Sequence, residues 1–442
     1  MNPPDILFYG DDFTGATDTL ATAARAGLRT LLFLQLPTRA RLAAAGALDC
    51  IGIAGASRSM TPAEMRVELE PVAAFFVRLG AGVLHYKTCS TFDSAPGVGS
   101  IGVAVEVLRT AVSEHWAAIV GGQPDLERYC LFGNLFAAAG SGGEVHRIDR
   151  HPTMSRHPVT PMHEADLRRH FALQGLCGIR AMTRPTYARG AAVFDEALED
   201  ALSTQPDAVL FDVADNGDLA FIGRALRRRT AAVAPDATLL VVGPSSVVQA
   251  LAPTRAVTAD ARPIAPAAGP VLVLAGSLSP VTARQVAAAR SFDIVRFDAS
   301  RLAVEPDYRA SVAADLASRL AAGRNVLGCT VAADGDAASA TASASAPDIP
   351  ARELARAVGD VLVRVLDIAP LARIGVAGGD TSSHAVLALE AWGLSYSAAL
   401  SPGVALCRLH SDRPSLDGVE IMLKGGQMGS VDIFERLVYG TV

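Results

Sequence analysis

Short apolar runs alternate with longer helix-forming stretches along most of the chain, and this alternation limits the fold more than any other feature of the sequence. One stretch opens with a Thr61–Glu64 capping box and a proline at its first helical position, and we expect a helix from there to about Leu79. The alternation predicts a mostly parallel, doubly wound α/β sheet with flanking helices, which binds ligands at the carboxyl ends of its strands. In the first half, the expected strands are 6–9, 28–34, 50–54, 83–86, 117–120 and 208–213.

The length of 442 residues favours two domains, because it exceeds what one compact core usually needs. Residues 252–269 are rich in proline and lack apolar periodicity, so we interpret them as a linker. A second alternating series begins at 271–275. We therefore expect one doubly wound domain at 1–251 and another at 270–442. Residues 332–347 are rich in Ala, Ser, Asp and Thr, and their composition predicts a surface loop.

Charge and composition exclude several classes of function. The net charge is −6 and charges of both signs are dispersed, whereas a nucleic-acid-binding protein would show a basic face. The N-terminus lacks a basic leader and no apolar run could span a bilayer, so we expect no membrane association. The six cysteines are scattered and form no CxxC pair, which is typical of reduced thiols in the cytoplasm.

Three turns in the second half predict a ligand that carries phosphate. Each joins a strand to a helix and is rich in Gly or Ser: GSLS (276–279), GGDTS (378–382) and KGGQMG (424–429). Glycines allow backbone N–H groups to approach a ligand, and helix N-termini attract anions. The structural alternative is that parallel folds need such tight turns anyway. A GxGxxG match at 97–102 is separated from its strand by a polar loop, so we interpret it as chance rather than a dinucleotide site.

Polar loops also follow the expected strands of the first half. GDDFTGA (10–16) places two adjacent carboxylates at a strand end, and Asp12 could accept a proton from an attacking hydroxyl. Capping of the next helix explains one of these carboxylates but not both. KTCSTFDS (87–94) and ASRS (56–59) add hydroxyls, Lys87 and Arg58, which suit a polyhydroxy acid, although each loop alone could simply be solvated.

The segment 146–163 contains four histidines, but their irregular spacing and the nearby prolines make a metal site the minority interpretation. RHPVTPM (156–162) is better explained as a rigid loop that offers Arg156 and His157 to an anion.

Six motifs occur in order along the chain: GDDFTGA, YKTCSTFDS, RHPVTPM, GSLSPVTARQ, GGDTS and LKGGQMG. Together they resemble the four-carbon acid sugar kinase family over essentially the whole length. The resemblance implies an N-terminal sugar-acid-binding domain, a C-terminal nucleotide-binding domain and an active site in the cleft between them. It also implies phosphorylation, with ATP and Mg²⁺, of a terminal hydroxyl of threonate, erythronate or 3-oxo-tetronate. The Tyr9-Gly10 start and FGNLF (132–136) resemble a subgroup whose substrate is a branched acid such as 3-oxo-isoapionate.

The motif matches and the loop patterns described above together suggest roles for individual residues. Asp12 is the expected general base, and the metal ligands are unknown. The expected substrate-binding residues are Asp11, Arg58, Lys87, Ser90, Arg156 and His157. The expected nucleotide-binding residues are Ser277, Gly378, Gly379, Asp380, Thr381, Lys424, Gly425 and Gly426.

The leading hypothesis is a cytoplasmic, ATP-dependent sugar-acid kinase whose partners are small molecules, with a homodimer compatible with this function. The alternative is a nucleotide-regulated sensor that binds a sugar acid without phosphoryl transfer. A dehydrogenase would rest on the GxGxxG match alone. The adjacent Asp11 and Asp12 favour catalysis, because a sensor needs no general base.

Overall fold

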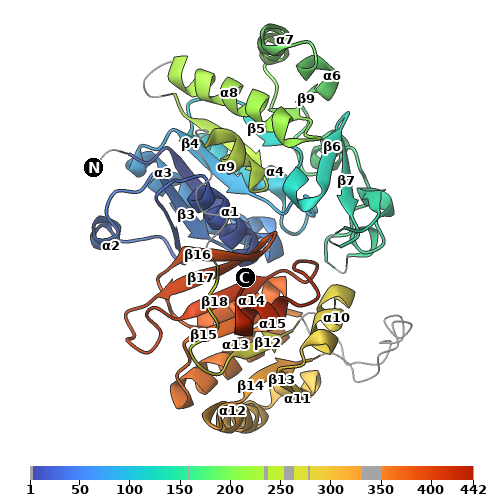
Figure 1. Cartoon of the computed structure of the whole chain (residues 1–442). Helices are drawn as coiled ribbons and strands as arrows, with labels where there is room; N and C mark the ends of the chain where they lie inside the picture. Colours follow the sequence, from blue (N-terminus) through green and yellow to red (C-terminus); the bar gives the residue numbers. More distant parts are fainter. Residues whose placement is uncertain are drawn as a thin grey trace. The chain divides into compact units, whose positions relative to one another are not determined.

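The computed structural model describes residues 3–140, 142–157, 159–232, 237–252, 263–276, 279–330 and 351–441, without the side chains of 231, 232, 351 and 380. The chain divides into two compact units, Met1–Ala259 and Asp260–Val442 (Figure 1). This division falls within the predicted linker 252–269, most of which lies outside the described residues, as does the segment 332–347. The domain limits at 251 and 270 remain predictions.

The first unit contains a parallel sheet with the strand order β2-β3-β1-β4-β11-β5-β10-β9. Its central strands are buried along their whole length, as expected for a parallel sheet that is covered on both faces. The strands are β1 Ile6–Gly10, β2 Thr30–Phe33, β3 Cys50–Ala54, β4 Val83–Lys87, β5 Ala117–Val120, β9 Ile179–Met182, β10 Ala208–Phe211 and β11 Leu239–Gly243.

Helices connect and cover these strands. The predicted capping box at Thr61 and Glu64 is confirmed, and it starts a helix that ends at Leu79 before the left-handed Gly80. The helices of this unit are α1 Phe13–Arg25, α2 Arg39–Ala44, α3 Pro62–Leu79, α4 Ile101–Leu108, α5 Leu167–Ala172, α6 Arg184–Tyr187, α7 Ala191–Ser203, α8 Asn216–Ala232 and α9 Ser246–Leu251.

The first unit also carries a small antiparallel sheet that the sequence patterns do not predict. It consists of β6 Arg128–Leu131, β7 Asn134–Ala138 and β8 Val145–Arg147. Phe132 and Gly133 form the two-residue turn between β6 and β7, and both have positive φ angles (52° and 79°). Tight hairpins of this kind usually carry Asn-Gly or Asp-Gly, so a Phe-Gly turn gives little signal in the sequence.

The second unit has the strand order β13-β14-β12-β15-β18-β17-β16. The strands from β13 to β18 in this order are parallel, whereas β17 runs antiparallel to both of its neighbours. The prediction of a mostly parallel α/β fold with flanking helices is confirmed. The elements are β12 Leu272–Ala275, α10 Pro280–Ala288, β13 Phe292–Arg296, α11 Ala299–Val304, α12 Pro306–Ala321, β14 Asn325–Cys329, α13 Ala351–Ile368, β15 Arg373–Ala377, α14 Gly379–Ala388, β16 Gly393–Ser401, β17 Val404–His410, β18 Glu420–Lys424 and α15 Ile433–Tyr439.

Candidate active site

The polar loops of the first unit meet because three neighbouring parallel strands end in register. Gly10 at the end of β1 pairs with Ala54 of β3 on one side and with Lys87 of β4 on the other. The loops GDDFTGA, ASRS and KTCSTFDS leave from these three positions. Backbone hydrogen bonds hold the loops together, since Asp11 N donates to Lys87 O (2.9 Å) and Arg58 N donates to Asp11 O (3.1 Å).

Asp12 both caps a helix and forms an ion pair. Its Oδ1 accepts a hydrogen bond from Gly15 N (2.9 Å) at the start of α1, and its Oδ2 accepts one from Thr14 Oγ1 (2.7 Å). Arg58 Nη2 also donates to Oδ2 at 2.5 Å. Burial pushes the pKa of Asp12 upward, but Arg58, Lys87 and these hydrogen bonds outweigh burial, so the pKa is lowered. Asp12 is therefore ionised and held in one orientation.

Asp11 differs from its neighbour in environment. It is buried, and its Oδ1 has no hydrogen-bond partner among the described residues. Burial raises the pKa of Asp11 to about 7, with Asp12 and Asp93 acting in the same direction and Arg58 and Lys87 acting against it. A carboxyl group in this state can accept a proton near neutral pH. Two adjacent carboxylates with separated pKa values are a common arrangement at acid–base sites.

Lys87 approaches Asp12 closely because residue 15 is a glycine. A Cβ atom at Gly15 would lie 2.4 Å from both Asp12 Oδ1 and Lys87 Nζ. Lys87 is buried, and its Nζ donates to Thr88 O at 2.5 Å. Ser90 is also buried, in the loop that follows Lys87. The cluster thus brings together the predicted residues Asp11, Asp12, Arg58 and Lys87.

Asp93 is a member of the cluster that the sequence motifs did not single out. Its Oδ1 accepts a hydrogen bond from Thr91 Oγ1 (2.6 Å) and its Oδ2 accepts one from Thr160 Oγ1 (3.4 Å). Burial opposes ionisation of Asp93, yet Arg58 and His157 lower its pKa. The carboxylates of Asp11, Asp12 and Asp93 therefore lie in the same cluster as the cations Arg58 and Lys87.

The loop RHPVTPM contributes His157 to the cluster. His157 Nδ1 accepts a hydrogen bond from Thr160 N (3.1 Å), and Thr160 in turn bonds Asp93. The side chain of Arg156 is exposed. In the described part of the chain, no group of three or more His, Cys, Asp or Glu side chains could hold a metal ion.

The GxGxxG segment packs against the protein itself. A Cβ atom at Gly99 would lie 2.4 Å from Arg58 O, and one at Gly102 would lie 2.0 Å from Gln174 O. Ser100 caps α4, which begins at the next residue. These glycines therefore allow close packing beside the cluster, and the dehydrogenase alternative loses its structural basis.

In the second unit, the three glycine-rich turns also start from strands that end in register. Ala377 of β15 pairs with Ala275 of β12 and with Lys424 of β18. Gly378 has φ 123°, which favours glycine, and α14 begins at Gly379 with Thr381 buried in its first turn. Ser277 and the Asp380 side chain lie outside the described parts of the structure.

Lys424 is fully buried at this edge. Its Nζ donates to Thr282 Oγ1 (3.1 Å) and to Gly425 O (2.9 Å), and Thr282 Oγ1 donates to Gly426 O (3.1 Å). Burial lowers the pKa of Lys424 to about 7. An ammonium group has three donors, and two of them have partners among the described residues, so the third is available for an anionic ligand. The arrangement suits a phosphate group at the end of β18.

Two family models match the chain: a sugar-binding N-terminal domain at residues 6–251 and a nucleotide-binding C-terminal domain at residues 272–434. A 3-oxo-isoapionate kinase from Paraburkholderia graminis is 40% identical, over 97% of this chain and 93% of its own. A 3-oxo-tetronate kinase from Methylobacterium radiotolerans is 31% identical over 96% of both chains. The chain belongs to this kinase family.

Solved structures share the kinase fold. A protein from Salmonella typhimurium LT2, provisionally named a tRNA synthase, has a TM-score of 0.77 and 25% identity over 98% of both chains. A Haemophilus influenzae protein from a domain-of-unknown-function family has a TM-score of 0.69 and 23% identity over 97% of this chain and 98% of its own. Within the described parts of the kinase, none of the helices has the length and apolar character needed to cross a membrane.

Lysine usage is a signal in the sequence that marks both candidate sites. Of the 39 lysines and arginines, only Lys87 and Lys424 are lysines. Each is buried and is the last residue of a parallel strand, β4 in one unit and β18 in the other. A lysine ammonium is compact and loses its proton more readily on burial than an arginine guanidinium does. The rarity of lysine in the sequence is therefore enough to point to these two positions.

Proposed function

We propose that the protein is an ATP-dependent kinase that phosphorylates a terminal hydroxyl of a short sugar acid. A branched acid of the 3-oxo-isoapionate type is the leading substrate, and 3-oxo-tetronate, threonate and erythronate are the linear candidates. The observation that carries the proposal is the buried cluster of Asp11, Asp12, Arg58 and Lys87 at the strand ends of the first unit. The 3-oxo-isoapionate kinase at 40% identity supports the choice of substrate class.

The carboxylate pair is proposed to remove the proton of the substrate hydroxyl. In phosphoryl transfer the protein mostly positions the reactants and stabilises charge, so a correctly placed carboxylate is sufficient as a base. Asp12 is the base proposed from the sequence, and its ion pair with Arg58 would fix its orientation toward the hydroxyl. Asp11 is the second candidate, supported by its raised pKa and its Oδ1, which lacks a partner among the described residues. The hydroxyl oxygen then bonds to phosphorus, the proton passes to a carboxylate and ADP leaves.

The second unit is proposed to bind ATP, which supplies the phosphoryl group. Lys424 would contact a phosphate with its remaining N–H donor, and the turn at Gly378 with the N-terminus of α14 would offer backbone N–H groups. Gly379, Asp380, Thr381, Gly425, Gly426 and Ser277 complete the proposed nucleotide site. Mg²⁺ is proposed to accompany ATP, held mainly by phosphate oxygens and water.

A coupled assay of ADP release tests this function. The purified protein is supplied with ATP and with single acids from a panel of linear four-carbon and branched five-carbon acids, with and without Mg²⁺. We expect ADP release that depends on one of the acids and on Mg²⁺. Binding of both ligands without turnover would favour the sensor alternative, and ADP release that is independent of every acid would contradict the proposal. The cytoplasmic location, the homodimer and the interdomain active site remain predictions.

A further inference from the structure

Arg128 is a buried cation that forms no ion pair among the described residues, although the Glu127 carboxylate acts on it electrostatically. The residue is 7% exposed, its Nη1 donates to Leu126 O, and its Nε has no hydrogen-bond partner in the described structure. Arg373 provides the contrast, because it is buried to a similar degree and is fully paired. Arg373 Nη2 lies 2.6 Å from Glu420 Oε2, and its Nη1 donates to two backbone carbonyls. An unpaired charge in a protein interior is costly, so the isolated guanidinium of Arg128 requires a reason.

The position of Arg128 relates it to the cluster of the first unit. It follows β5, and its backbone bridges to Gln123 directly after that strand. In the sheet β5 pairs with β11, and β11 pairs with β4, whose last residue Lys87 lies opposite Gly243. β5 and β4 therefore lie two strand spacings apart, which amounts to roughly 10 Å. Burial lowers the pKa of Arg128, and Cys89 in the loop after β4, Glu127 and Tyr129 act against burial.

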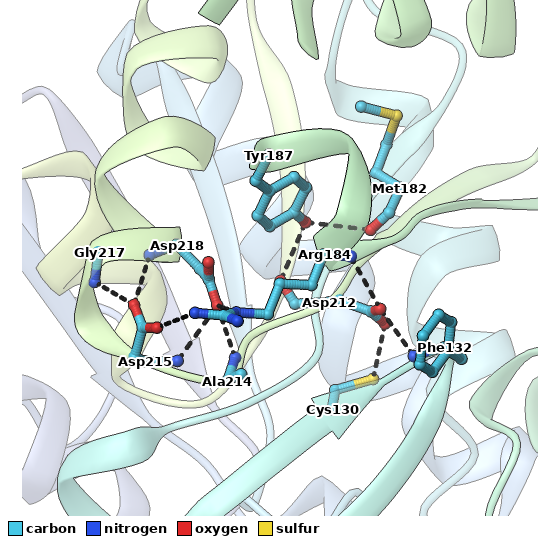
Figure 2. Close-up of polar contacts among 10 residues, drawn as sticks. All are labelled: Cys130, Phe132, Met182, Arg184, Tyr187, Asp212, Ala214, Asp215, Gly217 and Asp218. Carbon is cyan, nitrogen blue, oxygen red and sulfur yellow. Dashed lines mark hydrogen bonds and ion pairs between the residues drawn. The ribbon is translucent and has the colours of Figure 1, made fainter. Parts of the chain in front are cut away.

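The hairpin that carries Arg128 is anchored by the buried carboxylate of Asp212 (Figure 2). Asp212 Oδ2 accepts a hydrogen bond from Phe132 N (2.7 Å) in the turn between β6 and β7. Asp212 Oδ1 accepts one from Gly133 N (2.9 Å) in the same turn. Cys130 and Val213 also exchange backbone hydrogen bonds of 2.9 and 3.0 Å. These contacts hold β6 against the carboxyl end of β10 and so fix the strand that begins at Arg128. A binding residue needs such a rigid support.

We propose that Arg128 binds the carboxylate of the sugar-acid substrate. The proposal rests on the proposed function and names the residue that recognises the acid group. Arg58, the cation that the sequence suggested for a carboxylate, is already paired with Asp12. The planar guanidinium of Arg128 can donate to both oxygens of one carboxylate, and that contact would neutralise its charge.

The substitutions Arg128→Met and Arg128→Lys test the proposal. KM and kcat are measured for the acid of the panel that wild type phosphorylates best, and for its neutral analogue with a hydroxymethyl group in place of the carboxylate. We expect Arg128→Met to raise KM for the acid about 30- to 1000-fold, with kcat changed much less and the neutral analogue unaffected. Arg128→Lys should recover part of the affinity. Arg147→Met is the matched control, since Arg147 lies on β8 of the same small sheet and pairs with Asp149.

Stability separates binding from a structural role. Urea unfolding should show Arg128→Met at least as stable as wild type, because the substitution removes an unpaired buried charge. A less stable variant with an unchanged KM for the acid would overturn the proposal. If wild type releases no ADP with any acid, the proposed function fails, and calorimetric binding of the acids without nucleotide then tests Arg128 by itself. Equal affinity of wild type and Arg128→Met for every acid in that experiment would also overturn it.

Discussion

Replacement of Lys424 by methionine should make the nucleotide-free protein more stable while weakening its binding of nucleotide. Lys424 is fully buried, and burial lowers its pKa from 10.5 to about 7. The two pKa values differ by about 3.5, which means that burial destabilises the charged form of Lys424 by roughly 5 kcal/mol. Because the folded pKa lies below the unfolded pKa, the unfolded chain binds more protons between pH 7 and pH 10.5. The free energy of unfolding should therefore rise with pH in this window, and the full penalty is present below pH 7.

Lys424→Met removes the ammonium group and keeps most of the side-chain volume. The gain in the free energy of unfolding should be smaller than about 5 kcal/mol, because the hydrogen bonds from Nζ to Thr282 and Gly425 are also lost. We expect an increase of about 1–4 kcal/mol in the free energy of unfolding at pH 7, with less dependence on pH up to pH 9. The affinity for ADP should fall at least about tenfold, because a phosphate loses its cation.

Urea unfolding at pH 6, 7, 8 and 9, with calorimetric titration of ADP, measures both effects. The pKa itself can be read by NMR with ¹⁵Nζ-labelled lysine, since Lys87 and Lys424 are the only lysines in the chain. Lys424→Met assigns the two signals by removing one, and ADP should raise the pKa of Lys424 in wild type. A variant that is less stable than wild type at pH 7 and binds ADP equally well would refute the reasoning. It would show that Lys424 is neither destabilised by burial nor in contact with phosphate.

Three further predictions concern the first unit, and a fourth concerns the division of the chain. Asp12→Asn should lower kcat about 10²–10⁴-fold with little change in substrate affinity, and near-normal turnover would mean that Asp12 only caps α1. In wild type, kcat should rise with pH through about 7, because Asp11 loses its proton there. The substitution Asp11→Asn should remove this pH dependence. An unchanged pH profile in that variant would exclude Asp11 as the titrating group. Gly15→Ala should lower the free energy of unfolding in urea by about 1–3 kcal/mol and also lower kcat/KM, because the new Cβ would lie 2.4 Å from Asp12 Oδ1 and Lys87 Nζ. Unchanged stability and kcat/KM would show that both side chains relax freely. A fragment of residues 270–442 should bind ADP in calorimetry, and ADP binding only by residues 1–251 would contradict the predicted division of roles.

Much of this protein could be predicted from local sequence patterns. Apolar runs predicted the positions of β1, β3 and β4, since parallel strands covered on both faces must be apolar along their length, whereas β11 was not predicted. The capping box at Thr61 predicted the start of α3 because that signal is contained in four residues. The polar loops after β1, β3 and β4 were recognisable for the same reason, as each directly follows its own strand.

The tertiary structure decided which of these loops meet and in what electrostatic state. β11 begins at Leu239, far along the chain, yet it lies between β4 and β5, and no periodicity in the sequence specifies that order. The ion pair of Arg58 with Asp12 and the separation of the pKa values of Asp11 and Asp12 depend on the strand order β3-β1-β4, whereas the place of Arg128 near this cluster depends on β11 lying between β4 and β5. Local patterns report which face of an element is apolar, whereas charge pairing and desolvation depend on distances between residues that are remote in the sequence. The sequence alone therefore determined many of the elements and the chemistry available at their ends, and only the packed structure determined which charges are paired, which are buried and which are left for a ligand.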